Sequence, residues 1–162
     1  MHRLLLRSLE QTTAGGRQEL FRALLDQLVP DEARIIASLG NDGMVSPLVE
    51  VQARSALGKA ATPVLENASL IGRTAAVALP RLTPVYVAHL RSLGLLAIGP
   101  EDPALAREYE VLMADDVVRE ALDQTDGLLP PRVVRRTLRL SPLGQELWQA
   151  TKPADPEFGP QL

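Results

Sequence analysis

Two stretches late in the chain, residues 81–98 and 135–150, constrain the fold most strongly. In the first, Thr83-Pro84 is a helix start signal, because threonine suits the N-cap and proline the first helical position. Four apolar residues then recur at helical spacing and form one stripe: Leu82, Tyr86, Leu90 and Leu93. Gly94 is expected to end the helix, and the apolar run at residues 95–98 predicts a short strand.

The second stretch predicts a strand followed by a helix. Residues 135–140 alternate charged and apolar side chains, as in a half-exposed strand. Ser141-Pro142 then begins a last helix, which carries Leu143, Leu147 and Trp148 on one side. Together the two stretches give a helix, a glycine stop, a strand, a basic strand and a closing helix. This is the order of elements in the second half of a winged helix-turn-helix domain, in which the two strands form the wing.

The beginning of the chain predicts three helices and one strand. A first short helix lies around residues 4–9 and ends near Gly15-Gly16, and an amphipathic helix follows over residues 17–28. A third helix covers residues 30–40, after which an Asn-Asp-Gly turn signal leads to a short strand at residues 48–51. Two helices, a turn and a short strand are what precedes the recognition helix of a winged helix.

Two insertions extend this plan. Residues 62–80 begin with a start signal, and their apolar residues fall on one helical face, so we expect a helix before the recognition helix. Residues 101–126 contain nine acidic residues against two arginines. Apolar anchors within them predict an acidic insertion of two short helices between the wing strands.

We therefore expect a mainly helical α+β fold, a winged helix-turn-helix-like domain with a small antiparallel wing and helical insertions. Its 162 residues, 46% of them hydrophobic, suffice for one core. The expected organisation is an N-terminal helical extension over residues 1–16, the winged-helix-like domain over residues 17–152 and a flexible C-terminal tail over residues 153–162.

Composition narrows the functional classes. The chain has no cysteine, which excludes disulfides, thiol nucleophiles and thiolate metal sites. Only 3% of the residues are aromatic, which argues against stacking on single-stranded nucleic acid. A net charge of −3 means that any DNA binding needs a local basic patch. The sequence carries neither a signal peptide nor an apolar run of membrane-spanning length, so we expect a cytoplasmic protein.

No sequence motif indicates catalysis. The metalloprotease, Walker A, nucleophile-elbow and dinucleotide-binding patterns are absent. His89 has no acidic residue nearby in sequence to orient it, which favours a structural role over catalysis or metal binding. The Asp115-Asp116 pair is interpreted as a solvated helix face and Ser141 as a helix cap. We therefore expect no enzyme activity, no cofactor and no small-molecule substrate.

Basic residues offer the main functional alternative. In a winged helix the wing contacts phosphates while the recognition helix enters the major groove. Alternation would place Arg135 and Arg139 on one face of the basic strand and Arg136 on the other. The possible nucleic-acid contact set is Arg81, Arg91, Arg135, Arg136 and Arg139.

A competing interpretation of these arginines is a solvated strand that forms ion pairs with the acidic insertion. The outward positions of the recognition helix hold few side chains able to read base edges, and the nine acids would repel phosphates. A domain that binds another protein would instead expose an apolar patch, around Val85, Val87 and Ala88.

Three segments, in this order and spacing, resemble the bacterial Abi-alpha family of abortive-infection proteins: LLDQLVPDEARIIASLG, LTPVYVAHLRSLGLLAIGPE and RRTLRLSPLGQELWQA. The family's L-x-P-D-E-A-R-I helix start falls on residues 28–35, and its P-x-Y-x-x-x-L-x-x-L-G-L helix on residues 84–95. Its basic L-T-P-x-G closing helix falls on residues 140–144, with Ser141 in place of the usual threonine. The resemblance covers residues 17–151, and because relatives generally carry more sequence upstream, we expect a short N-terminus here.

This resemblance implies a part in abortive infection, in which an infected bacterium limits phage spread. It brings no established catalytic residues to this chain. We therefore expect a non-enzymatic defence protein that acts through contacts with a protein partner or a second copy of itself. The alternative is a winged-helix DNA-binding regulator.

Overall fold

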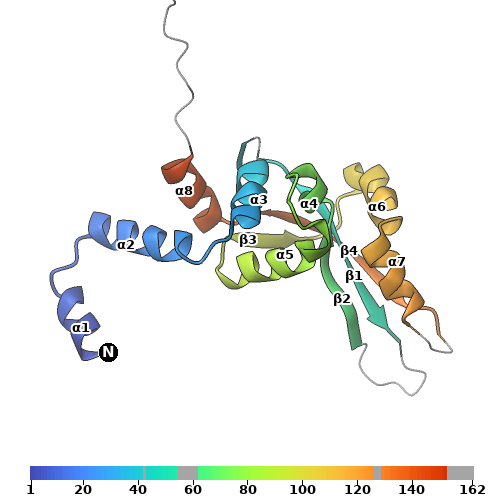
Figure 1. Ribbon diagram of the computed structural model, residues 1–162, viewed down its shortest axis with the longest axis horizontal. Helices are drawn as coiled ribbons and strands as arrows, with labels where there is room; N and C mark the ends of the chain where they lie inside the picture. The colour runs from blue at the N-terminus through green and yellow to red at the C-terminus, as the bar shows by residue number, and fades with distance from the viewer. Residues whose placement is uncertain (42, 55–61, 126–128, 153–162) are drawn as a thin grey trace, which may run out of the picture.

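A computed structural model describes residues 1–41, 43–54, 62–125 and 129–152 (Figure 1). Its helices are α1 (His2–Ser8), α2 (Thr13–Leu25), α3 (Pro30–Asn41), α4 (Ile71–Thr74), α5 (Thr83–Ser92), α6 (Ala106–Met113), α7 (Asp116–Asp123) and α8 (Pro142–Thr151), with short 3-10 turns η1 (Pro80–Leu82) and η2 (Pro103–Leu105). Its strands are β1 (Ser46–Ala53), β2 (Thr62–Ser69), β3 (Leu96–Gly99) and β4 (Arg132–Leu140).

Within the described residues, the four strands form one antiparallel sheet with the order β2-β1-β4-β3. β1 is central, because it pairs with β2 along one edge and with β4 along the other. The two strands expected on either side of the acidic insertion do pair: β3 and β4 are antiparallel, with Leu96 opposite Leu140. Consecutive strand residues point to opposite faces, and Leu48 and Val49 accordingly belong to different core clusters.

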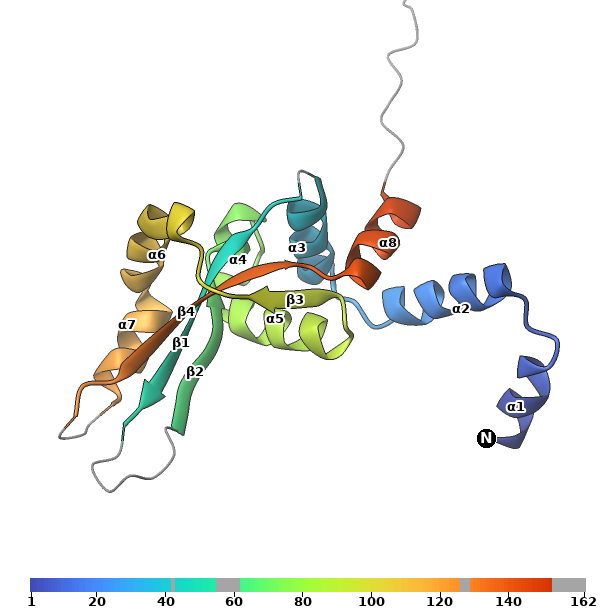
Figure 2. The same ribbon diagram turned by 180° about the vertical axis from the view of Figure 1, so that it is seen from behind.

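The larger core cluster packs one face of the sheet against several helices. It contains Phe21 and Leu24 of α2 together with buried residues of α3, α5 and α8. The smaller cluster packs the other face against α6 and α7, with Tyr109, Leu112 and Val118 almost completely buried. Figures 1 and 2 show α6 and α7 on one side of β1 and β4, and α3, α4 and α5 on the other.

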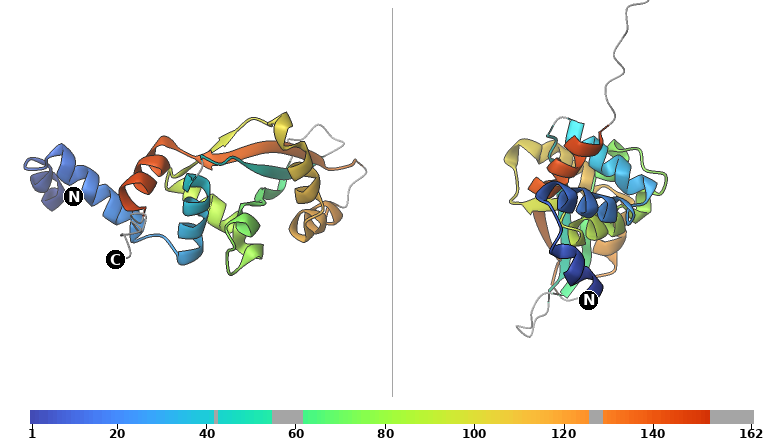
Figure 3. Two further views of the ribbon diagram at one scale, coloured as in Figure 1. Left: turned by 90° about the horizontal axis from the view of Figure 1, so that it is seen from above. Right: turned by 90° about the vertical axis from the view of Figure 1, so that its left-hand side faces the viewer.

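The N-terminal helices project from this body. Figure 3 shows α1 at the far end of α2, away from the sheet and its helices. α2 attaches to the body through Phe21 and Leu24, whereas α1 has no buried residue. The observed architecture is thus mixed α+β and mostly helical, as expected, while the winged-helix assignment itself is not confirmed. None of the described helices is long and apolar enough to cross a membrane.

The prediction of a helix over residues 62–80 was wrong. Residues Thr62–Ser69 form strand β2, and only Ile71–Thr74 and the η1 turn that begins at Pro80 are helical. The physical reason lies in β1, whose second edge needs a hydrogen-bonding partner because Val49 and Val51 are completely buried. Residues spaced by four also share one face of a strand, so the apolar pattern did not distinguish the two structures.

Other boundaries moved by a few residues. Gly15 and Gly16 lie inside α2 instead of ending the first helix, because Thr12 caps α2 by accepting from the Gly15 N–H at 3.1 Å. Thr83 is not an N-cap, since its hydroxyl donates to the Pro80 carbonyl at 2.6 Å. The division of the chain at residues 16 and 17, which falls inside α2, stays a prediction, and the expected tail at residues 153–162 lies outside the described part.

Three expectations for elements in the later part of the chain were confirmed. Gly94 has a positive φ of 74° and lies just after the end of α5. Strand β3 begins two residues later. Ser141 caps α8, because its hydroxyl accepts from the Gly144 N–H at 3.0 Å. The acidic insertion holds two short helices, α6 and α7, between β3 and β4.

Candidate functional site

The candidate site is built on η1 and α5, which two buried carboxylates at the start of α3 hold in place. Asp31 and Glu32 follow Pro30 in the first turn of α3, and both are buried. A buried carboxylate is costly unless hydrogen bonds replace its lost water. Both side chains have such partners, and most of those partners lie in or beside η1 and α5.

Asp31 anchors the chain that leads into η1. One of its carboxylate oxygens accepts from the Ala78 N–H at 2.9 Å, and the other from the Leu79 N–H and the Tyr86 hydroxyl, each at 3.2 Å. The Ala78 N–H is the main reason that the pKa of Asp31 lies below its usual value. Burial, together with the contact to Asp31, raises the pKa of Tyr86.

Glu32 anchors the middle of α5. Its Oε2 accepts from the Val29 N–H at 3.0 Å, while its Oε1 lies 2.7 Å from His89 Nδ1. Glu32 therefore both caps the N-terminus of α3 and orients the imidazole of α5. No acidic residue lies near His89 in sequence, but the fold supplies one, because Glu32 comes from a helix 57 residues away in sequence.

These anchors hold an exposed apolar surface. Leu79, Leu82 and Val85 are 55%, 41% and 60% exposed, and we call these three residues the apolar patch. The sequence predicted a patch around Val85, Val87 and Ala88. Val85 and Ala88 are indeed exposed, but Val87 is completely buried in the larger core cluster.

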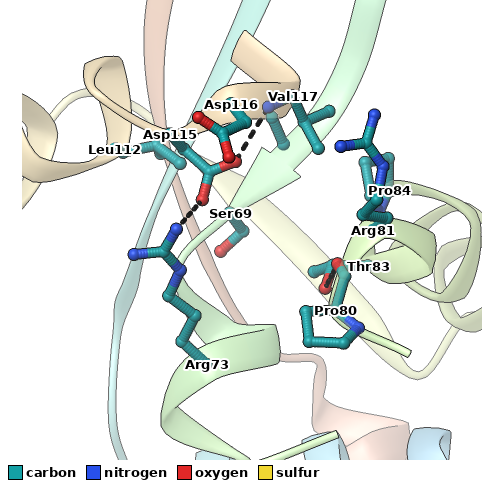
Figure 4. Close-up of a pocket in the computed structure, with 11 residues that line it drawn as sticks. Ser69, Arg73, Pro80, Arg81, Thr83, Pro84, Leu112, Asp115, Asp116 and Val117 are labelled. Atoms are coloured by element: carbon teal, nitrogen blue, oxygen red, sulfur yellow. Dashed lines mark hydrogen bonds and ion pairs between the residues drawn. The ribbon is translucent and has the colours of Figure 1, made fainter. Parts of the chain in front are cut away.

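A pocket of about 330 Å³ lies beside the patch, between the η1–α5 segment and the N-terminus of α7 (Figure 4). Arg73 and Arg81 line it, as do Thr83 and Asp115. The Arg73 guanidinium lies 2.7 Å from the Asp115 carboxylate, which also caps α7 by accepting from the Val117 N–H at 3.0 Å. The Asp115-Asp116 pair is thus partly engaged in structural contacts, and no potential metal-binding group of three or more side chains occurs in the described residues.

The predicted nucleic-acid contact residues are dispersed over three elements. Arg81 lies in η1, where its guanidinium is 2.6 Å from the Glu120 carboxylate of α7, a contact that raises the pKa of Arg81. Arg91 of α5 donates to the Asn67 side chain. Arg136 and Arg139 are exposed on β4.

Arg135 of β4 is engaged with the acidic insertion. Its guanidinium lies 3.2 Å from the Glu110 carboxylate and 3.7 Å from that of Glu101, and it stands 5.4 Å from the centre of the Tyr109 ring. Arg81 and Arg135 therefore both pair with acids of the insertion, which agrees with the ion-paired interpretation for these two residues. Contact of the arginines with nucleic acid stays a prediction.

Sequence reasoning quoted Asp31 and Glu32 as part of a motif but gave them no role. Half of a capping signal was present for Glu32, since glutamate at the third helical position often accepts from the N-cap N–H, but Val29 stands where a capping box has serine or threonine. The long-range partners Ala78, Tyr86 and His89 had no such signal, because only the folded chain brings them to α3.

Comparison with known proteins agrees with the resemblance of the motifs. The sequence profile of the Abortive infection alpha family matches residues 1–151. A solved structure of an uncharacterized protein from the hydrocarbon-degrading marine bacterium Alcanivorax borkumensis SK2 is similar, with 30% sequence identity and a TM-score of 0.67. The similarity covers 86% of this chain and 96% of that protein's chain. No curated protein matches the sequence. The profile match spans nearly the whole chain, including every motif at the candidate site, and the chain therefore belongs to the Abortive infection alpha family.

Proposed function

We propose that this protein takes part in cytoplasmic defence against phage by binding a protein partner at the apolar patch, without catalysis of its own. The observation that carries the proposal is the exposure of Leu79, Leu82 and Val85 on a segment that buried carboxylates immobilise. Exposed apolar side chains gathered in one place are typical of interaction sites. A surface that is already ordered loses less conformational entropy on binding, which favours affinity.

The state of the titratable groups supports a binding role over a catalytic one. Asp31 and Glu32 use their oxygens to hold backbone N–H groups, Tyr86 and His89 in place. Asp115 is occupied with Arg73 and the N-terminus of α7. Each of these groups would have to give up a structural contact in order to act as an acid, a base or a metal ligand.

The DNA-binding alternative assumes that β3 and β4 act as the wing of a winged helix and that α5 is the recognition helix. Its support is limited to Arg136 and Arg139, which are exposed on β4. Arg81 and Arg135 already pair with acids, and those acids stand where they would repel phosphates. We therefore place protein binding first.

The test is a phage challenge of a bacterial host that expresses the chain. A Leu82→Ser/Val85→Ser variant should lose protection, because it removes apolar contact area from the patch while leaving the core intact. An Arg136→Ala/Arg139→Ala variant is the matched control, since its residues are exposed on another surface and should be dispensable. Both variants should keep the thermal unfolding temperature of the parent chain.

Two outcomes contradict the proposal. Protection retained by the patch variant means that the patch is not the binding surface. Protection lost only in the arginine variant, together with salt-sensitive binding of the parent chain to duplex DNA, favours the regulator instead.

A further inference from the structure

His89 reaches the surface of α5 next to the apolar patch. Its side chain is 39% exposed, whereas the side chain of Glu32, which faces its Nδ1 at 2.7 Å, is only 2% exposed. Val85 of the patch lies four residues before His89 on α5, and side chains at this spacing are neighbours on a helix surface. Val29, whose N–H donates to the same Glu32 carboxylate, is also exposed. The imidazole therefore stands beside exposed apolar side chains.

The second ring nitrogen of His89, Nε2, is open to solvent. It forms no hydrogen bond within residues 1–41, 43–54, 62–125 and 129–152, where Nδ1 makes the contact to Glu32. In that same part of the chain, no buried side-chain nitrogen or oxygen lacks a hydrogen-bond partner. Nε2 is therefore not buried. His89 turns one nitrogen toward the protein interior and leaves the other available to a partner protein.

The Glu32 carboxylate determines which nitrogen carries the proton. An ionised carboxylate can only accept a hydrogen bond, so the nitrogen that faces it, Nδ1, must donate. A neutral imidazole has one N–H, and Nε2 is then left with a lone pair and acts as an acceptor. The carboxylate is itself held in place, because its other oxygen accepts from the Val29 N–H at 3.0 Å.

We propose that His89 determines which partner the apolar patch accepts, because its Nε2 accepts a hydrogen bond from an N–H or O–H group of that partner. Glu32 is a positioning residue, since it acts through the imidazole. This contact rests on the proposed function and adds the chemistry of the partner, which is a hydrogen-bond donor flanked by apolar side chains. A partner that presents an acceptor at this point leaves two polar groups unpaired, so the contact discriminates between apolar surfaces.

The first test is nitrogen-15 NMR of the imidazoles in the full chain at neutral pH, which distinguishes protonated from unprotonated ring nitrogens. The chain has only two histidines, and His89→Asn identifies the signals of His89. We expect a proton on Nδ1 and none on Nε2. A proton on Nε2, in the other neutral tautomer or in the charged ring, overturns the proposal.

Glu32→Gln should reverse the polarity of Nε2 while keeping the shape of the side chain. The amide oxygen can accept from Val29, which leaves the amide N–H facing His89 Nδ1 as a donor. Nδ1 must then accept, and the proton moves to Nε2. The same spectrum should show this exchange. An unchanged tautomer in the variant overturns the proposal, because Glu32 then does not set it.

The second test is the phage challenge. Glu32→Gln should lose protection, because His89 then presents an N–H where the partner also presents a donor. His89→Asn should lose it too, since the asparagine amide can still donate to Glu32 but no group takes the place of Nε2. His2→Asn is the matched control, because it makes the same change at an exposed position of α1, and it should protect as the parent does. Thermal unfolding checks that each variant is folded, and His89→Asn decides alone if Glu32→Gln is not.

The outcomes separate this contact from the proposed function. Protection kept by His89→Asn, or by a Glu32→Gln chain whose His89 carries its proton on Nε2, overturns the contact. Loss of protection in Leu82→Ser/Val85→Ser then still supports the patch as the binding surface. Protection kept by Leu82→Ser/Val85→Ser removes the patch and the contact together.

Discussion

The Glu32 carboxylate lies 2.7 Å from His89 Nδ1 and joins the first turn of α3 to the middle of α5. Two motifs of the family, one at the start of α3 and one along α5, therefore meet in space. The neighbouring Asp31–Tyr86 contact joins the same two helices a second time. Both contacts tie α3 to α5, so these residues contribute to the packing of the two helices.

Replacing Glu32 by alanine should lower the free energy of unfolding by about 1–3 kcal/mol, because the partly buried Val29 N–H loses its acceptor and His89 loses its partner. Glu32→Gln should cost less, since the amide oxygen can still accept from Val29. Urea unfolding of both variants and of a Glu32→Ala/His89→Ala cycle measures the coupling. Strictly additive effects of the two alanine changes would contradict the contact.

Asp31→Asn should make the free energy of unfolding less dependent on pH in the acidic range. The pKa of Asp31 is lowered in the folded chain, so its carboxylate stabilises the fold above the usual pKa of 3.8 and this stabilisation is lost as the pH falls through the lower folded value. The difference in unfolding free energy between the parent and the variant should be largest near neutral pH and shrink below pH 3.8. Asp123→Asn, at an exposed position of α7, is the control. A difference that does not change with pH would rule out the carboxylate's charge as the cause.

Gly144→Ala should destabilise the fold by about 1–3 kcal/mol, because a Cβ at this position would stand 2.1 Å from the Leu95 carbonyl oxygen and backbone must move. Gly16→Ala is the matched control. Its Cβ would meet only the flexible Gln11 side chain at 3.2 Å, and alanine favours α2 by up to about 1 kcal/mol. The thermal unfolding temperature should therefore fall for Gly144→Ala, and it should rise or stay unchanged for Gly16→Ala.

Tyr109→Phe should cost about 1 kcal/mol, because the buried hydroxyl donates to the Arg136 carbonyl at 2.7 Å and connects α6 to β4. Tyr109→Ala should cost about 3–5 kcal/mol, since it also empties the centre of the smaller core cluster. Urea unfolding distinguishes the two losses. Equal losses in both variants would show that the hydroxyl, and not the ring, provides the stabilisation.

Local signals in the sequence predicted much of the later part of the fold. Gly94 ends α5 because glycine adopts the positive φ that the chain needs there, and Ser141 followed by proline starts α8. Neither boundary depends on contacts with residues distant in sequence. The positions of β3 and β4 followed from these two boundaries.

Long-range contacts decided the rest. Residues 62–69 have a pattern that fits a helix or a strand, and the open edge of β1 selects the strand. His89 and Glu32 are 57 residues apart, and no local pattern relates them. The five arginines of the predicted contact set lie on three different elements, and Arg81 and Arg135 reach acids of α6 and α7 that only the fold brings near. Their contact with nucleic acid stays a prediction.

The central place of β1 also has a consequence for the order of events during synthesis. β1 meets β2 soon after both leave the ribosome, yet its other edge pairs with β4, where Ser46 stands opposite Leu138. Translation adds about 5–20 residues per second, so this edge stays without its partner for at least several seconds while the intervening residues are made. We expect a nascent chain that stops before β4 to aggregate or to engage a chaperone, and the last strand to complete folding of the body.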